Sequence, residues 1–162
     1  MKATHNIPGK IFNVENLRQQ VERWKLLGKK VVFTNGVFDI LHEGHLSSLN
    51  EAASHGDYLV VAVNSDASVK RLKGDSRPVN NENSRALLLA SLLVTDAIVV
   101  FHEDTPIEVV KSIMPDVMVK GGDYKLEDIA GAKEVLENGG KVILAKIVEG
   151  VSTTNIIDRI KK

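Results

Sequence analysis

A chain of 162 residues, 43% hydrophobic and 26% charged, has the size and composition of one globular domain, which excludes disordered and fibrous proteins. Its 21 basic and 21 acidic residues balance, so no overall field attracts nucleic acid or an anionic membrane, and any bound anion must be held locally. The absence of cysteine excludes disulfides, thiol catalysis and cysteine-based zinc sites.

Neither a signal peptide nor a membrane span is predicted. The start of the chain, MKATHNIPGKIFNVENL, lacks the apolar stretch of a signal peptide. The longest apolar-rich stretch, ALLLASLLV, is far shorter than the roughly 20 residues that cross a bilayer. We therefore expect a cytoplasmic protein.

The first predicted element is an amphipathic helix from Val14 to Leu27, which Gly28 ends. Its apolar residues recur every three or four positions, the spacing of one buried helix face. The helix contains Trp24, and we assign it only a packing role. Residues 1–28 are thus expected to be an N-terminal helical extension packed on a single domain, residues 1–162.

Five short apolar runs follow, four of them rich in valine. Continuous apolar runs are typical of strands buried on both faces of a parallel sheet. We predict an α/β fold, a Rossmann-like doubly wound five-stranded parallel sheet with helices on both faces. The strands are KVVFTN, YLVVAVN, AIVVF, VMVK and KVILAK, and the helices span 44–54, 82–93, 105–113, 130–138 and about 153–160.

Polar residues follow each predicted strand. In an open parallel sheet the carboxyl ends of the strands share one edge, and ligands bind in the crevice where the strand order reverses. Four of the five polar segments suit phosphate binding, and HEDTP after the third strand is the doubtful one. The four are TNGVFDILHEGH, NSDASVKRLKGDSRP, KGGDY and EGVSTTN.

The first of these segments places His42 and His45 at the start of a predicted helix. Gly36 and Gly44 permit tight turns or a close ligand approach. The free N–H groups and positive dipole end of the helix favour an anion such as phosphate, to which both imidazoles can donate. The alternatives are a helix cap with a surface histidine, or a metal pair. Zinc needs three or four ligands and a different histidine spacing, so we expect no protein-bound metal.

The string GVFDILHEGH resembles the Gly-x-Phe-Asp to His-x-Gly-His signature of the nucleotidyltransferase superfamily, which includes cytidylyltransferases and adenylyltransferases. GVSTTNII, after the last strand, resembles its second signature. Four further strings make nearly the whole chain similar to the adenylyltransferase half of bifunctional heptose kinase/adenylyltransferases. They are VAVNSDASVKRLKGDSRPVN, EDTPIEVV, PDVMVKGGDY and IAGAKEVLENGGKV.

This resemblance implies transfer of AMP from ATP to D-glycero-β-D-manno-heptose 1-phosphate, giving ADP-heptose and pyrophosphate for lipopolysaccharide core synthesis. A separate heptose kinase is implied upstream, because no sugar-kinase half is recognised here. Mg²⁺ is expected to be held by the ATP phosphates rather than by side chains. The expected partners are these small molecules, with no nucleic acid and no membrane, and a homo-oligomer stays open.

The resemblance also implies roles for single residues. His42 and His45 hold the triphosphate and stabilise charge in the transition state. A lysine closes over the phosphates from a flexible loop, with Lys73 as the first choice and Lys70 as the second. Contacts to ATP are expected from Thr34, Asn35, Gly36, Phe38, Gly44, Lys70, Arg85, Lys120, Gly121, Gly122, Asp123, Tyr124, Ser152, Thr153 and Thr154, of which 120–124 border the base and ribose. Contacts to the acceptor are expected from Asp39, Asn64, Asp66 and Arg77.

Two other functions stay open. One is a cytidylyltransferase of the same fold acting on glycerol 3-phosphate or another alcohol phosphate, and the other is a nucleotide-binding protein without turnover. The basic segment VKRLKGDSR could be only a solvated loop. KGGDY could be only a turn, and VSTTN could be only an N-cap. His5, His55 and His102 are expected to be surface or structural residues.

Overall fold

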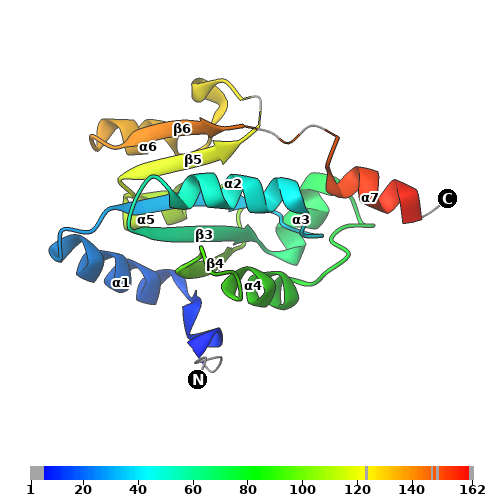
Figure 1. Ribbon diagram of the computed structural model, residues 1–162, viewed down its shortest axis with the longest axis horizontal. Helices are drawn as coiled ribbons and strands as arrows, with labels where there is room; N and C mark the ends of the chain where they lie inside the picture. Colours follow the sequence, from blue (N-terminus) through cyan, green and yellow to red (C-terminus); the bar gives the residue numbers. More distant parts are fainter. Residues whose placement is uncertain (1–5, 123, 147, 149, 161–162) are drawn as a thin grey trace.

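Six parallel strands form one sheet in the computed structural model, which describes residues 6–122, 124–146, 148 and 150–160 (Figure 1). The order across the sheet is β1-β4-β3-β2-β5-β6. The five predicted strands and the α/β Rossmann-like fold are confirmed. The strands are β1 (Ile11–Phe12), β2 (Val31–Gly36), β3 (Tyr58–Asn64), β4 (Ala97–Phe101), β5 (Val117–Gly121) and β6 (Lys141–Ala145).

The predicted strand number was one too low, because β1 was missed. This edge strand has only two residues, which pair with β4 through Ile11 and Ile98 and through Phe12 and Val99. Two residues are too few for a periodic pattern, so nothing local in the sequence indicates a strand. The N-terminal residues therefore contribute to the same sheet as the rest of the chain.

The strand order reverses between β2 and β5. From β2 the chain adds β3 and β4 on one side, and then returns to add β5 and β6 on the other. In Figure 1 the strand arrows point toward the side of the molecule where α3 and α7 lie. A crevice for ligands is expected there, beyond the carboxyl ends of β2 and β5.

Helices pack on both faces of the sheet, as predicted. Buried residues of α1, α5 and α6 form one apolar core with one face, and buried residues of α2 and α4 form a second core with the other. All the described helices are too short or too polar to span a bilayer. The helices are α1 (Val14–Leu26), α2 (Glu43–Ala53), α3 (Asp66–Lys73), α4 (Glu82–Ala90), α5 (Ile107–Ile113), α6 (Ala132–Glu137) and α7 (Thr153–Ile160), with short 3-10 turns η2 (Pro8–Lys10) and η3 (Leu126–Asp128).

The prediction of a flexible loop around Lys70 and Lys73 is wrong, because these residues belong to α3. The side chain of Ser65 accepts a hydrogen bond from the Ser68 amide and so caps the helix, and Val69 is fully buried beneath it. The segment VKRLKGDSR is highly charged and buries only this one apolar residue, so its sequence shows too little helical spacing of apolar residues to predict a helix.

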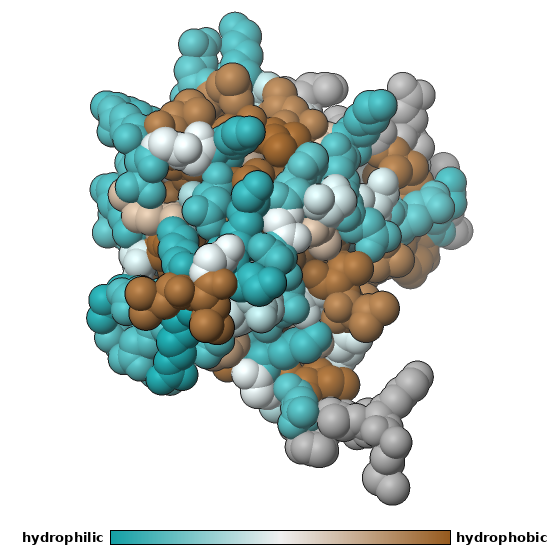
Figure 2. Space-filling view, turned by 60° about the vertical axis from the view of Figure 1, so that its left-hand side comes forward, coloured by the Kyte–Doolittle hydropathy of each residue, from teal (hydrophilic) through white to brown (hydrophobic). Residues whose placement is uncertain are grey.

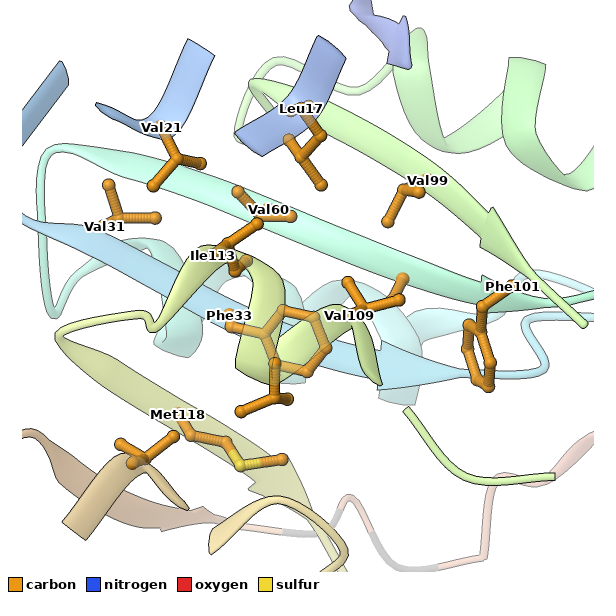
Figure 3. Close-up of a cluster of buried hydrophobic side chains, with 14 of the residues drawn as sticks. Leu17, Val21, Val31, Phe33, Val60, Val99, Phe101, Val109, Ile113 and Met118 are labelled. Atoms are coloured by element: carbon orange, nitrogen blue, oxygen red, sulfur yellow. The ribbon is translucent and has the colours of Figure 1, made fainter. Parts of the chain in front are cut away.

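Side chains alternate between the two cores along each strand. Phe33 and Met118 belong to the core with α1, α5 and α6, and Figure 3 shows them with Val109 and Ile113 of α5. Their neighbours Val32 and Val119 belong to the core with α2 and α4. This period of two determines which face each later residue of the same strands reaches.

The N-terminal helix α1 packs on one face of the sheet. Trp24 is 8% exposed, and its ring stacks on that of Tyr58 with centroids 4.1 Å apart. Elsewhere on the surface, hydrophobic residues form separate patches between hydrophilic ones, as Figure 2 shows for one face. Such scattered apolar surface is normal for a folded protein.

Candidate functional site

A cavity of about 330 Å³ opens at the carboxyl ends of β2 and β5, where the strand order reverses. Its walls come from the end of β2, the start of α2, the end of β5 and the segment before α7. Ten residues predicted to contact ligand line it: Thr34, Asn35, Gly36, Phe38, His42, Gly44, His45, Lys120, Gly121 and Gly122. Sequence reasoning missed Ser48, Leu49, Val148 and Val151.

The turn after β2 shapes one wall. Phe38 has a φ of 49°, in the left-handed region that non-glycine residues rarely adopt. Its ring lies so close to Gly36 that a Cβ there would stand 3.0 Å from a ring carbon. The same ring lies 5.2 Å from that of His45, centroid to centroid. Gly36 therefore leaves room for the Phe38 ring.

The two histidines stand together in the cavity. His42 is the residue before α2 and His45 lies in its first turn, and their rings stack with centroids 3.8 Å apart. A Cβ on Gly44 would lie 3.1 Å from the His42 ring, so the glycine makes room for it. The Nδ1 atoms of both rings are buried and have no hydrogen-bond partner among the described residues. His55 Nε2 is also buried and unpaired, but His55 does not line this cavity. Buried polar atoms are normally paired, so two unpaired ring nitrogens from residues that line one cavity indicate a place for a ligand.

Both imidazoles are neutral near pH 7. Burial, with a smaller contribution from neighbouring His42, lowers the pKa of His45 to about 4. Burial also lowers the pKa of His42. Each ring therefore offers one N–H donor before ligand binds, and a bound anion would favour the doubly protonated ring.

Lys120 is the only Lys or Arg among the described residues that line this cavity. Its ammonium donates to the side-chain oxygen of Asn35 at 3.2 Å and to the Asn35 carbonyl at 3.4 Å. Burial lowers the pKa of Lys120. The ammonium also lies 5.5 Å from the centroid of the Tyr124 ring.

Glycines after β5 keep the opposite wall open. A Cβ on Gly121 would lie 3.1 Å from the hydroxyl of Ser48, which explains why α2 can approach β5 here. Gly122 has a φ of 131°, and a Cβ there would lie 2.5 Å from the Tyr124 ring. Asp123, which was predicted to contact the nucleotide, lies outside the described residues.

The second signature meets the first in space. The hydroxyl of Thr153 donates to the Ile40 carbonyl at 3.4 Å, across more than a hundred residues of sequence. Ser152 caps α7, since its hydroxyl accepts a hydrogen bond from the Asn155 amide at 3.1 Å. Ser152, Thr153 and Thr154 do not line the cavity, whereas Val151 beside them does.

Asp39 and Arg77, predicted to contact the acceptor, are joined to each other behind the cavity. Asp39 is 1% exposed, and its carboxylate accepts from Arg77 Nε at 2.5 Å and from the amides of Val79 and Asn80 at 2.9 Å. Burial opposes ionisation of Asp39, but the Asn80 and Val79 amides and the guanidinium together lower its pKa. The carboxylate thus holds residues 77–80 against the turn after β2.

Arg85, predicted to reach the phosphates, is 1% exposed and has three partners within the fold. Its guanidinium donates to the carbonyls of Asn80 at 2.9 Å and Val37 at 2.7 Å, and to the Asp66 carboxylate at 2.7 Å. Arg85 therefore lies behind the cavity wall, where it ties the turn after β2 to α3 and α4.

The other predicted contacts also lie outside the cavity lining. Asn64 is buried and donates to the Ser68 hydroxyl at 3.0 Å. Lys70 and Lys73 are exposed on α3 and make no ion pair within the described part of the chain.

The remaining histidines are placed as follows. His102 is exposed and His55 is partly buried, while His5 lies outside the described residues. The described residues include no group of three or more His, Asp or Glu side chains arranged to hold a metal ion.

Residues 33–159 match a protein-family model described as cytidylyltransferase-like. The chain is 56% identical over 146 residues to the bifunctional protein HldE of Cronobacter sakazakii, covering 90% of this chain and 31% of that protein. It is 54% identical over 152 residues to HldE of Shigella sonnei, covering 94% and 32%. The chain thus spans about a third of the length of these curated relatives.

Two solved structures are similar to this one. A lipopolysaccharide core biosynthesis protein from Thermoplasma volcanium is 36% identical, with a TM-score of 0.61 over 75% of this chain and 98% of that one. A pantoate-beta-alanine ligase from Francisella tularensis is 13% identical, with a TM-score of 0.62 over 93% of this chain and 76% of that one. At that identity the second likeness concerns the fold alone.

Proposed function

The chain belongs to the cytidylyltransferase-like family, and from that membership we propose that it transfers AMP from ATP to D-glycero-β-D-manno-heptose 1-phosphate. The observation that carries the proposal is the pair of stacked histidines with unpaired nitrogens, in a cavity at the reversal point of the sheet. The similarity to HldE over at least 90% of this chain and to a lipopolysaccharide core biosynthesis protein supports the choice of substrate.

The reaction needs no nucleophile from the protein. A phosphate oxygen of the sugar phosphate attacks the α-phosphorus of ATP, and a new P–O bond forms. The bond from the α-phosphorus to the oxygen that bridges it to the β-phosphorus breaks, and pyrophosphate leaves with the electron pair. Catalysis of such a transfer consists mainly of positioning and of stabilising charge.

The histidines supply that stabilisation in this proposal. His42 and His45 donate to oxygens of the departing pyrophosphate, beside the free amides at the start of α2. Because burial keeps both rings neutral beforehand, their positive charge develops only where the anion binds. Lys120 places a cation at the opposite wall of the cavity.

Mg²⁺ enters with the triphosphate in this proposal. The described residues that line the cavity include no carboxylate, so the ion would be held by phosphate oxygens and water, ligands that it commonly takes. When bound, it supplies further neutralisation of the phosphate charge.

We also propose a cytoplasmic location, because the reaction consumes ATP and the chain contains no cysteine. The kinase reaction that makes the sugar 1-phosphate is assigned to another protein or to another part of a longer one.

The direct test incubates the protein with ATP, Mg²⁺ and the heptose 1-phosphate, and measures ADP-heptose and pyrophosphate. CTP with glycerol 3-phosphate forms a parallel arm, since the family description names cytidylyltransferases. Stoichiometric ADP-heptose and pyrophosphate are expected. Product in the CTP arm alone would identify the sister enzyme, and tight ATP binding without product in any arm would identify a non-catalytic binding protein.

A further inference from the structure

A second, smaller cavity adjoins the first. Its volume is about 150 Å³, and it shares the side chains of Asn35 and Lys120 with the larger cavity. Its volume is less than half that of the larger cavity, so the larger cavity suits the bulkier nucleotide. Its remaining walls are residues 104–106 after β4, Tyr124 and residues 128–130 around the end of η3.

The small cavity lies on the other face of the sheet from α2 and its histidines. Asn35 is two residues after Phe33, and Lys120 is two residues after Met118, so both continue the strand positions that face α5 and α6. α2, which carries His45, packs instead on the opposite face. The carboxyl ends of β2 and β5 thus lie between the small cavity and the histidine pair.

This arrangement matches the geometry of the proposed transfer. In a direct displacement the attacking and leaving oxygens lie on opposite sides of the phosphorus, roughly in line. Pyrophosphate beside His42 and His45 requires the attacking phosphate to approach from the far side of the strand edge. Lys120, which lines both cavities, lies between the two substrates in this arrangement.

The lining of the small cavity suits a polyol. The carboxylates of Asp104 and Asp128 accept hydrogen bonds from hydroxyl groups, and the hydroxyls of Thr105 and Tyr124 both donate and accept them. The charge of Asp104 is offset by its ion pair with Arg71, so Asp128 is the carboxylate that disfavours a triphosphate here. Lys120, the one Lys or Arg among the described residues that line this cavity, lies where it meets the larger one.

The wall around Asp104 is held in place by α3. Arg71 Nε donates to the Asp104 carboxylate at 2.7 Å, and the same guanidinium donates to the His102 carbonyl at 2.7 Å. The Ser68 hydroxyl donates to the Glu103 carbonyl at 2.9 Å. Three consecutive residues after β4 are therefore anchored before any ligand binds, as expected of a preformed binding wall.

We propose that this small cavity receives the hydroxylated ring of the acceptor sugar phosphate, with the acceptor phosphate on Lys120 facing the α-phosphorus. The assignment rests on the proposed function. It moves Tyr124 from the nucleotide to the acceptor, and it replaces Asp39, Asn64, Asp66 and Arg77 as acceptor contacts, since these four have partners elsewhere.

The test measures steady-state kinetics for Asp128→Asn and Thr105→Val, with ATP and the heptose 1-phosphate varied in turn. Each variant should raise KM for the sugar phosphate about 10-fold, the size of one lost hydrogen bond, and leave KM for ATP unchanged. Glu127→Gln is the matched control, because Glu127 precedes Asp128 in η3 but lines a different cavity. It should behave like the unmodified protein.

The outcomes separate the two proposals. An active unmodified protein with unchanged sugar-phosphate KM in both variants overturns the cavity assignment alone. A raised KM for ATP in either variant, with that for the sugar phosphate unchanged, also overturns it and returns the cavity to the nucleotide. Failure of the unmodified protein to use the heptose 1-phosphate overturns the proposed function, and this inference with it.

Discussion

The histidine pair at the start of α2 and the arginine network around Arg85 adjoin the same turn after β2, but they differ in what their polar atoms bind. The Nδ1 atoms of His42 and His45 have no partner among the described residues. The Arg85 guanidinium has three, and the Asp39 carboxylate is equally occupied. Around this turn, the unpaired buried groups line the cavity and indicate a binding surface, whereas the fully paired Arg85 and Asp39 lie outside the lining and support it.

The largest expected effect comes from the supporting side. Arg85→Met removes the fully buried partner of an ion pair with the partly exposed Asp66, and it takes one donor each from the Val37 and Asn80 carbonyls. We expect the free energy of unfolding to fall by about 3 to 5 kcal/mol, as for other broken buried pairs, measured by urea denaturation. Arg71→Met, which breaks an exposed pair with Asp104, should cost under about 1 kcal/mol. Unchanged stability of the Arg85 variant with weakened ATP binding would instead return this residue to the phosphates.

On the binding side, His42→Ala and His45→Ala should each lower turnover by at least about 100-fold, the scale for losing a donor to transition-state charge. The matched control is His102→Ala, since His102 is exposed and lines neither cavity. Steady-state rates of pyrophosphate release measure the effect. Near-normal rates in both histidine variants would show that His42 and His45 have no catalytic role. The proposed difference in function between this pair and Arg85 would then be wrong.

A variant of Lys73 tests whether the exposed cations on α3 bind ligand, as proposed for the histidine pair. Because Lys73 is exposed and its charge is screened by solvent, Lys73→Ala should raise KM for ATP about fivefold or less, the range of exposed charge interactions. The effect should shrink as salt is raised. Lys133→Ala on α6, also exposed, should change nothing. A loss comparable to that of the histidine variants would show that α3 closes onto the phosphates.

The smallest expected signal is proton uptake on ATP binding. His45 has a pKa of about 4 in the free protein and is mostly neutral at pH 5, so an anion that raises this pKa makes binding take up less than one proton. Calorimetry in buffers of different protonation enthalpy measures it, with His45→Gln as control. Equal proton uptake by the unmodified protein and by His45→Gln at pH 5 would show that the triphosphate does not bind at His45.

The same lowered pKa has a consequence for the stability of the free protein. The folded state resists protonation of His45, whereas the unfolded state accepts the proton near the ordinary pKa of about 6.5. His45 therefore contributes full stability above about pH 6.5, and this contribution declines as the pH falls toward 4. His45→Gln should flatten that part of the stability profile, measured by thermal unfolding.

Elements that depend on local pattern were predicted well. The strands from β2 to β6 follow from apolar runs. Helices α2, α4 and α7 begin within one residue of the predicted positions, whereas α5 and α6 begin two residues later than predicted. The shared edge of a parallel sheet then brought Thr34, Gly36, His42 and Lys120 to one cavity. β1 and α3 were missed because a two-residue strand and a helix with one buried apolar residue carry too little pattern.

The amino-acid sequence by itself determined the fold class, the position of the crevice and the histidine pair, because short-range patterning and the two signatures specify them. Only the tertiary structure decided which charged residues face that crevice. Arg85 is held by Val37, 48 residues away, and Lys120 by Asn35, 85 residues away. A charged side chain is free or occupied according to partners that folding supplies, and those partners leave no mark on its local sequence.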